Sequence, residues 1–175
     1  MIDEGQREVR AGLPEHLGRL WRYGVLLSGK RDTAEDLVQA TCVRALERGH
    51  QFNPGTRLDR WLFAILRSIW LNEVRARRIR QGEGLVEAET SLVFDGIQEI
   101  ETNIFAHQVL KEVQSLPETQ RETLFLVYVE GLTYRETAQL LEVPIGTVMS
   151  RLAAARENLS RLTVGTTRSA MRESD

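Results

Sequence analysis

The chain has little of what a secreted, membrane-embedded or metal-dependent protein needs. Its 175 residues include one cysteine, Cys42, and three histidines. A single cysteine excludes an internal disulfide framework and fits a reducing compartment, so we expect a cytoplasmic protein. No apolar run reaches 18 residues and the first ten residues lack the apolar centre of a secretory signal, so we expect no membrane insertion.

Catalytic patterns are missing as well. His16, His50 and His107 are scattered, and no pair of residues has metal-ligand spacing. Gly82 and Gly84 do not form a phosphate loop, because neither the Gly-Lys-Ser/Thr ending nor a preceding strand is present. We therefore expect a protein that is not an enzyme, with no catalytic residue, metal, cofactor or small-molecule substrate.

The net charge of −2 conceals three blocks of opposite sign. Residues 56–81 hold seven arginines against two acids, residues 82–112 seven acids against one lysine, and residues 144–172 five arginines against one acid. Two basic blocks separated by an acidic one suggest two polyanion-binding surfaces on separate modules. The alternative is that these charges only solvate helix faces.

Apolar residues recur with a helical period nearly everywhere, and no stretch alternates as a strand does. The spacing predicts an all-α fold with a helical domain over 8–81, an acidic linker over 82–102, a second helical domain over 103–162 and a disordered tail over 163–175. The expected helices cover 8–28, 32–48, 58–80, 103–115, 118–130, 133–141 and 144–160.

Several details of the first domain follow from local signals. Pro14 could break the first helix, and Asp32 with Glu35 predicts a capping-box start for the second. The apolar stripes place Leu17 and Leu46, among others, in the core. Trp61 lies on an apolar stripe and is expected to be mainly core, whereas Trp70 lies off the stripe and could pack between modules or against a partner.

Residues 131–157 predict a helix, a short turn and a second helix. Ala138 permits a close crossing, Val148 and Leu152 pack back onto the first helix, and Pro144 fits the first turn of the second. This arrangement suits insertion into a DNA major groove, although a tri-helical core without a DNA role has the same spacing.

Three stretches, 32–46 (DTAEDLVQATCVRAL), 60–78 (RWLFAILRSIWLNEVRARR) and 116–157, resemble the extracytoplasmic-function (group IV) sigma factors. These are the detachable promoter-recognition subunits of bacterial RNA polymerase. The resemblance implies an alternative sigma factor that binds core RNA polymerase and promoter DNA, directs promoter-specific transcription initiation, and is held by an anti-sigma factor.

The resemblance also implies site residues. The acidic helix near residue 32 is expected to dock on the clamp helices of the largest polymerase subunit, although its acids could simply stabilise the helix N-terminus. The polymerase-binding set is Asp32, Glu35, Asp36, Leu37 and Gln39.

The first domain is expected to recognise and melt the −10 element, with a flipped base held near the loop at 50–57. The set for the −10 element is Asn53, Arg57, Arg60, Trp61, Arg67, Asn72, Arg75, Arg77 and Arg78. The set for the −35 element is Thr133, Tyr134, Thr147, Met149, Ser150, Arg151, Ala153, Ala154 and Arg156.

The chain departs from the commoner family pattern at several positions. Met149 stands where relatives often have Lys or Arg, and Ala153 and Ala154 stand where an aromatic, His or Arg is frequent. These residues cannot form bidentate bonds to guanine but could contact a thymine methyl group, which predicts an unusual −35 preference. Glu142 replaces a glycine often found in the turn, at a cost of about 1 kcal/mol if that residue is left-handed.

In the first domain, Ser68 and Asn72 replace the usual Asn and Asp, so single-residue roles there stay open. Two other functions compete with the leading one. A stand-alone helix-turn-helix regulator leaves residues 32–46 and 56–81 unexplained. A sigma mimic that binds only an anti-sigma protein should have lost its basic surfaces.

Overall fold

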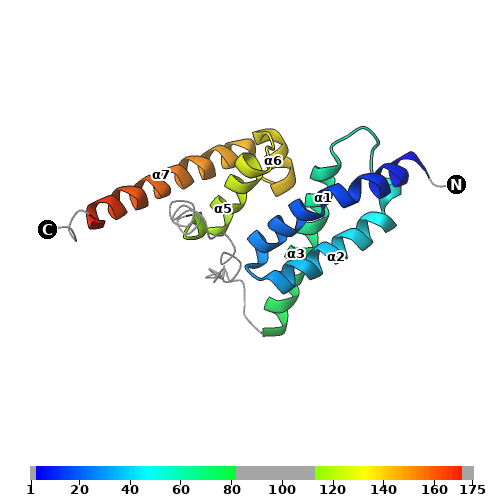
Figure 1. Ribbon diagram of the computed structural model, residues 1–175, viewed down its shortest axis with the longest axis horizontal. Coiled ribbons are helices and arrows are strands. Elements are labelled where there is room, and N and C mark those ends of the chain that lie inside the picture. The colour runs from blue at the N-terminus through cyan, green and yellow to red at the C-terminus, as the bar shows by residue number, and fades with distance from the viewer. Residues whose placement is uncertain (1–2, 82–112, 171–175) are drawn as a thin grey trace. The chain divides into compact units, whose positions relative to one another are not determined.

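The computed structural model describes residues 3–81 and 113–170 (Figure 1). The chain divides into two compact units, Met1–Gly96 and Ile97–Asp175. Within the described residues every regular element is a helix, as the all-α prediction requires. None of these helices is long and apolar enough to cross a bilayer. The predicted linker over 82–102 and most of the helix over 103–115 lie outside the described residues.

The first unit is built from α1 (Glu4–Ser28), α2 (Arg31–Glu47), the short 3-10 helix η1 (Gly49–Gln51) and α3 (Leu58–Gln81). The three long helices pack against one another around side chains that are almost completely buried. Tyr23 and Phe63 meet edge to face in this core, with ring centroids 5.3 Å apart. The largest buried side chains also include Leu20, Leu37, Leu62 and Leu66.

Two predicted features of helix boundaries were wrong. Helix α1 continues through Pro14. Proline has no N–H, so the backbone carbonyl one turn before it loses its helical hydrogen bond. Pro14 lies on the exposed side of the helix, where water can bond that carbonyl instead. Helix α2 begins at Arg31 with Lys30 as its N-cap, and Asp32 lies in its first turn without a capping bond. The two-residue turn explains this early start: Gly29 is left-handed, and the Ser28 hydroxyl accepts a bond from the Lys30 N–H at 3.2 Å.

The predicted core of the first unit needs four changes. Leu17 and Leu46 are exposed, because the buried row passes through neighbouring positions such as Leu13 and Thr41 instead. Trp61 is only half-buried and packs on Phe52, with centroids 5.4 Å apart. Trp70 is buried, 7% exposed, and the guanidinium of Arg77 lies over its ring.

The second unit contains α5 (Glu118–Leu124), the π-helix η2 (Phe125–Val129), α6 (Tyr134–Leu141) and α7 (Ile145–Ala170). The helix predicted over 118–130 is therefore present, but its last turn is wider, with the Glu130 N–H bonded to the Phe125 carbonyl at 3.0 Å. Helix α7 starts just after Pro144, whose carbonyl accepts from the Thr147 N–H at 2.9 Å.

The tail predicted as disordered over 163–175 is helical as far as Ala170. No proline follows Pro144, so nothing removes a backbone donor from the continuing helix. Residues 171–175 lie outside the described residues.

Glu142 ends α6 in the left-handed conformation, with φ 57° and ψ 43°. The Val143 N–H reaches the Ala138 carbonyl and the Glu142 N–H reaches the Gln139 carbonyl, at 3.0 and 3.3 Å. This is the Schellman arrangement, in which glycine is usual at the left-handed residue. The prediction for Glu142 depended on a left-handed backbone at that residue, and this condition is confirmed.

We expect Glu142→Gly to raise the free energy of unfolding of the second unit by about 1 kcal/mol, because glycine adopts this conformation without a Cβ clash. Gly131→Ala is the matched reverse change: Gly131 also has a positive φ, 67°, and a Cβ there meets nothing within 4 Å. Gly131→Ala should lower the free energy of unfolding of the second unit by a similar amount. Urea unfolding followed by circular dichroism measures both, and equal stability of the two variants would contradict the argument.

Candidate nucleic-acid and protein interfaces

Helix α7 is divided lengthwise into a buried and an exposed side. Val148 and Leu152 are almost completely buried against Ala138 of α6, at the crossing where a small residue was predicted. Leu124, Val127 and Val143 pack around this contact. The close crossing fixes which side of α7 faces outward, so the helix-turn-helix predicted over 131–157 is confirmed.

The outward side of α7 carries four of the predicted residues for the −35 element. Met149 is 54% exposed, and Ser150, Ala153 and Arg156 are exposed beside it. Thr147, Arg151 and Ala154 are half-buried at the margins. Between Ile145 and Arg156 this helix has no acid. Such a surface can approach a phosphate backbone without like-charge repulsion.

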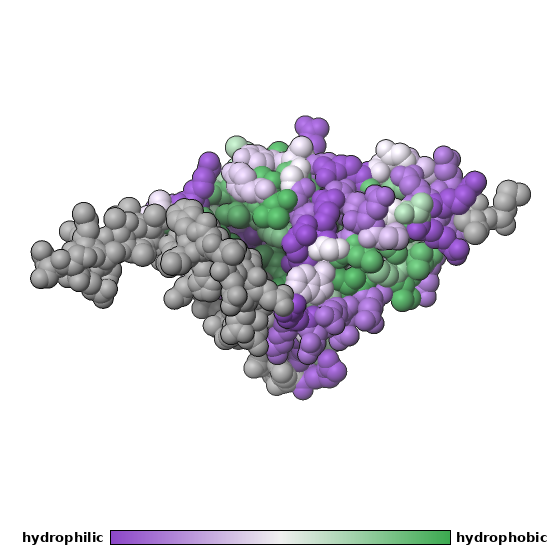
Figure 2. Space-filling model, in the orientation of Figure 1, coloured by the Kyte–Doolittle hydropathy of each residue, from purple (hydrophilic) through white to green (hydrophobic). Residues whose placement is uncertain are grey.

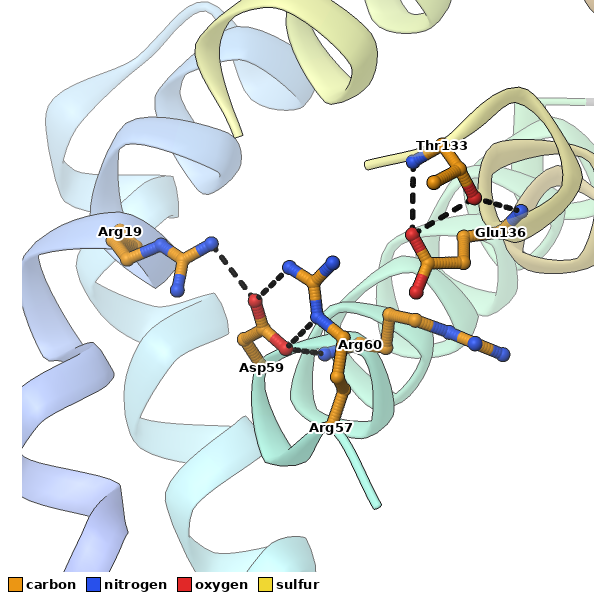
Figure 3. A network of polar contacts seen from close by, with 6 residues as sticks. All are labelled: Arg19, Arg57, Asp59, Arg60, Thr133 and Glu136. Atoms are coloured by element: carbon orange, nitrogen blue, oxygen red, sulfur yellow. Dashed lines mark hydrogen bonds and ion pairs between the residues drawn. The ribbon is translucent and has the colours of Figure 1, made fainter. Parts of the chain in front are cut away.

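Thr133 has a structural task that sequence reasoning did not assign to it. Its N–H and hydroxyl both donate to the Glu136 carboxylate, at 2.8 and 3.0 Å, and its hydroxyl accepts from the Glu136 N–H at 3.2 Å (Figure 3). This capping box starts α6. The one donor hydrogen of the hydroxyl is thus used at the helix start, and the contact of Thr133 with the −35 element stays a prediction. Tyr134 beside it is partly exposed.

The acidic side of α2 faces outward. Asp32, Glu35, Asp36 and Gln39 are all exposed. Leu37 is completely buried in the core of the first unit, so its side chain presents no surface to a partner and supports the helix from inside. Its place in the polymerase-binding set stays a prediction. A one-residue step on a helix turns a side chain by about 100°, which separates Leu37 from its exposed neighbours.

The same side of α2 continues into apolar residues that sequence reasoning did not select. Val43 is 56% exposed and Leu46 is 38% exposed. Figure 2 shows hydrophobic residues gathered over α2. Helical spacing could have found them, since 32, 36, 39, 43 and 46 share one face. The exposed face of α2 is thus acidic at its beginning and apolar at its end.

The arginines of the −10 set are held in different ways along α3. Arg77 bonds the Glu73 carboxylate at 3.1 Å and lies over the Trp70 ring, 5.1 Å from its centroid. Arg75 lies 3.4 Å from the side-chain oxygen of Asn72, and both are exposed. Arg60, Arg67 and Arg78 are half-buried. Figure 2 shows a hydrophilic surface where α3 ends.

Asp59 organises the start of α3 and is absent from the predicted site residues. It is 6% exposed, and its carboxylate receives bonds from Arg19 at 3.0 Å, Arg57 at 2.7 and 3.1 Å, and the Arg60 N–H at 2.9 Å (Figure 3). An acid among the arginines at the start of the block 56–81 was the available signal. The cluster ties α1 to α3 and holds Arg57 at the end of the loop.

The environment of Asp59 moves its pKa to about 2. Burial alone would raise the pKa, but the Arg57 hydrogen bonds and charge, the Arg60 N–H and the Arg19 hydrogen bond outweigh it and lower the pKa. The folded state therefore holds the carboxylate charged at a pH where the unfolded chain is already protonated.

Stability from Asp59 is present above the unfolded pKa of about 4 and is lost as the pH falls toward 2. We expect the difference in unfolding free energy between the natural chain and Asp59→Asn to shrink by up to about 2 kcal/mol between about pH 5 and pH 2. Acid-dependent urea titrations of both chains measure this. A difference that is constant over that range would contradict the assigned pKa.

Among residues 3–81 and 113–170, no three His, Cys, Asp or Glu side chains are placed to hold a metal ion. The expectation that the chain uses no metal or cofactor stays a prediction.

Each of the two units matches a known protein family. Residues 14–79 match the family Sigma-70 region 2, and residues 106–159 match Sigma-70, region 4. The ECF RNA polymerase sigma factor EcfG of Rhodopseudomonas palustris (strain TIE-1) is 34% identical over 166 residues, covering 93% of this chain and 86% of EcfG. SigL of Mycobacterium tuberculosis is 30% identical, covering 89% of this chain and 88% of its own.

Solved structures give the same result. The sigma factor RpoE from Bartonella quintana, solved in complex with the anti-sigma factor NepR, has a TM-score of 0.74 at 30% identity, covering 90% of this chain and 97% of RpoE. Sigma factors regulate transcription and are not a family of enzymes. The chain belongs to the extracytoplasmic-function (ECF) sigma factors, and it is an alternative sigma factor that directs transcription with RNA polymerase.

Proposed function

We propose that each unit performs one part of initiation. The first unit, corresponding to the expected domain at 8–81, binds core RNA polymerase and opens the −10 element. The second, corresponding to 103–162, reads the −35 element. The observation that carries the proposal is the exposed side of α7 between Ile145 and Arg156, which bears no acid and which the buried contact of Val148 and Leu152 with Ala138 turns outward.

Polymerase binding is assigned to the exposed face of α2. Asp32, Glu35 and Asp36 offer negative potential to a basic partner helix, and Val43 and Leu46 add apolar area beside them. This division lets charge guide the encounter while apolar burial slows dissociation. We expect the chain to bind polymerase in the cytoplasm, where polymerase and promoters meet.

Opening of the −10 element is assigned to α3 and the loop before it. Arg75 and Arg77 are exposed cations that attract phosphates, and Asn53 is an exposed amide for an unpaired base. Trp61 is half-buried against Phe52, so only part of its ring remains for stacking.

Mapping of transcript 5′ ends after overproduction tests this assignment. New start sites should share two sequence elements, and changes at Ser150 or Ala153 should alter base preference only in the upstream one. Arg151→Ala or Arg156→Ala should weaken all promoters alike if these side chains bind phosphates. Start sites that share only one element would contradict the division of labour.

The small apolar side chains of α7 are expected to read thymine methyl groups. Replacing a contacted thymine of the −35 element with deoxyuridine removes one methyl group, worth about 0.8 kcal/mol, and should weaken holoenzyme binding about fourfold. Met149→Lys should instead favour guanine at its position. Deoxyuridine outside the element is the control. Unchanged binding with deoxyuridine at every thymine of the element would contradict methyl readout.

We also propose an anti-sigma partner that covers the exposed face of α2. Support comes from RpoE of Bartonella quintana, which is 30% identical and was solved with the anti-sigma factor NepR. Such a partner should compete with core polymerase for the purified chain. Simultaneous binding of both would contradict the shared surface.

Two other functions make different predictions. A stand-alone helix-turn-helix regulator should bind DNA and not core polymerase. A sigma mimic should bind an anti-sigma protein and yield no transcript. The exposed arginines of α3 and the absence of acids from α7 between Ile145 and Arg156 favour the sigma factor over the mimic.

A further inference from the structure

The first turns of α1 lie directly against the segment that joins α2 to α3. Gly5 is buried, and a Cβ on it would lie 2.5 Å from the Phe52 carbonyl oxygen and 2.9 Å from that of Gly49. Gly49 is buried in return, and a Cβ there would lie 3.0 Å from the Cα of Gln6. Two glycines thus allow backbone to touch backbone at this place.

The chain after Phe52 forms a tight turn. The Thr56 N–H and hydroxyl both bond the Asn53 carbonyl, at 3.2 and 2.6 Å. Pro54 and Gly55 are its central residues, and Gly55 has φ 76°. Proline followed by a left-handed glycine is the pattern of a type II turn. The turn is therefore closed on itself and leaves Asn53 and Thr56 exposed.

One side chain of α1 holds this turn from outside. The Glu8 carboxylate accepts the N–H of Gly55 at 3.1 Å, across 47 positions of sequence. The two ends of the segment are held by α3: Phe52 is 3% exposed against Trp61, and Arg57 bonds Asp59. Glu8 supplies the bond that the structure gives to the middle of the turn.

We propose that Gly5 and Glu8 are positioning residues for recognition of the −10 element. They hold the turn Asn53–Thr56 so that its exposed polar groups face one unpaired base in a fixed orientation. This inference rests on the proposed −10 role of the loop. Residues 4–8 precede the stretch that matches Sigma-70 region 2, which begins at residue 14, so the family match assigns them no part. A rigid turn discriminates among bases because a wrong base cannot reorient its partners.

The test compares base preference at each −10 position, using purified holoenzyme and run-off transcription from promoters that differ by one base. Glu8→Ala should lower the ratio between the best and the worst base about threefold, as expected for one lost hydrogen bond, while −35 preferences stay unchanged. Glu8→Gln should retain the natural ratio, because its amide oxygen still accepts from Gly55. Glu15→Ala, an exposed acid on the same helix, is the matched control.

Gly5→Ala supplies a second, independent change, since its methyl group must push the Phe52 carbonyl away. It should reduce the same ratio, and tryptophan fluorescence reports whether the first unit still folds. Should Gly5→Ala fail to fold, Glu8→Ala alone decides. Natural base ratios in Glu8→Ala would overturn the inference. If the natural chain itself shows no −10 base preference, or Asn53→Ala leaves that preference intact, the proposed function of the loop fails instead.

Discussion

Asp59→Ala is expected to lower the free energy of unfolding of the first unit by about 3 kcal/mol. Asp59 is 6% exposed, and its carboxylate accepts bonds from two arginines and a backbone N–H. Its removal leaves Arg19 and Arg57 facing each other without the negative charge between them. Both arginines are partly exposed, so water can solvate their charges once the carboxylate is gone. The expected loss of unfolding free energy therefore lies at the lower end of the range for a broken buried ion pair.

Urea unfolding of the full chain can measure this change selectively. All three tryptophans, Trp21, Trp61 and Trp70, lie in the first unit, so their fluorescence follows that unit alone. Glu73→Ala is the matched control: Glu73 also bonds an arginine of α3 at 3.1 Å, but it is 42% exposed, and its loss should cost about 0.5 kcal/mol or less. Equal effects of the two changes would show that the Asp59 cluster does not hold α1 to α3.

The double change Glu35→Lys with Asp36→Lys is expected to weaken binding to core RNA polymerase at least about 100-fold. Reversing two exposed charges turns attraction into repulsion, at a cost of several kcal/mol in a charge-matched interface. Neither side chain belongs to the core, so the first unit should keep its stability.

The matched control for this double change is Glu4→Lys with Glu15→Lys. It alters the net charge by the same amount at exposed positions of α1. Titration of labelled chain with core polymerase at two salt concentrations should separate the two variants, with the larger difference at low salt. Similar losses in both would mean that overall charge, rather than the face of α2, guides binding.

The helices and the helix-turn-helix could be predicted from sequence because apolar spacing is a local property. Ala138, Val148 and Leu152 were assigned to one contact from spacing alone, and the structure places them together. Apolar spacing predicts which face of a helix is buried, however, and not how wide the buried face is. Leu46 and Leu17 lie at the edge of their stripes and are exposed, because packing of three helices leaves those edges uncovered.

Contacts between distant residues could not be predicted. The Glu8–Gly55 bond and the Arg19–Asp59 pair join residues 47 and 40 positions apart, and neither leaves a periodic signal. The wider turn at Phe125–Val129 was missed for a related reason, since one extra residue in a helix barely alters its apolar pattern.

Run-off transcription with purified core polymerase, this chain and a promoter identified by 5′-end mapping tests the central claim most directly. We predict one transcript that starts at the mapped position, requires both the chain and the core enzyme, and disappears with the Glu35→Lys, Asp36→Lys double variant but not with its charge-matched control. If polymerase and chain together start no transcript at that position, the chain does not direct initiation as described.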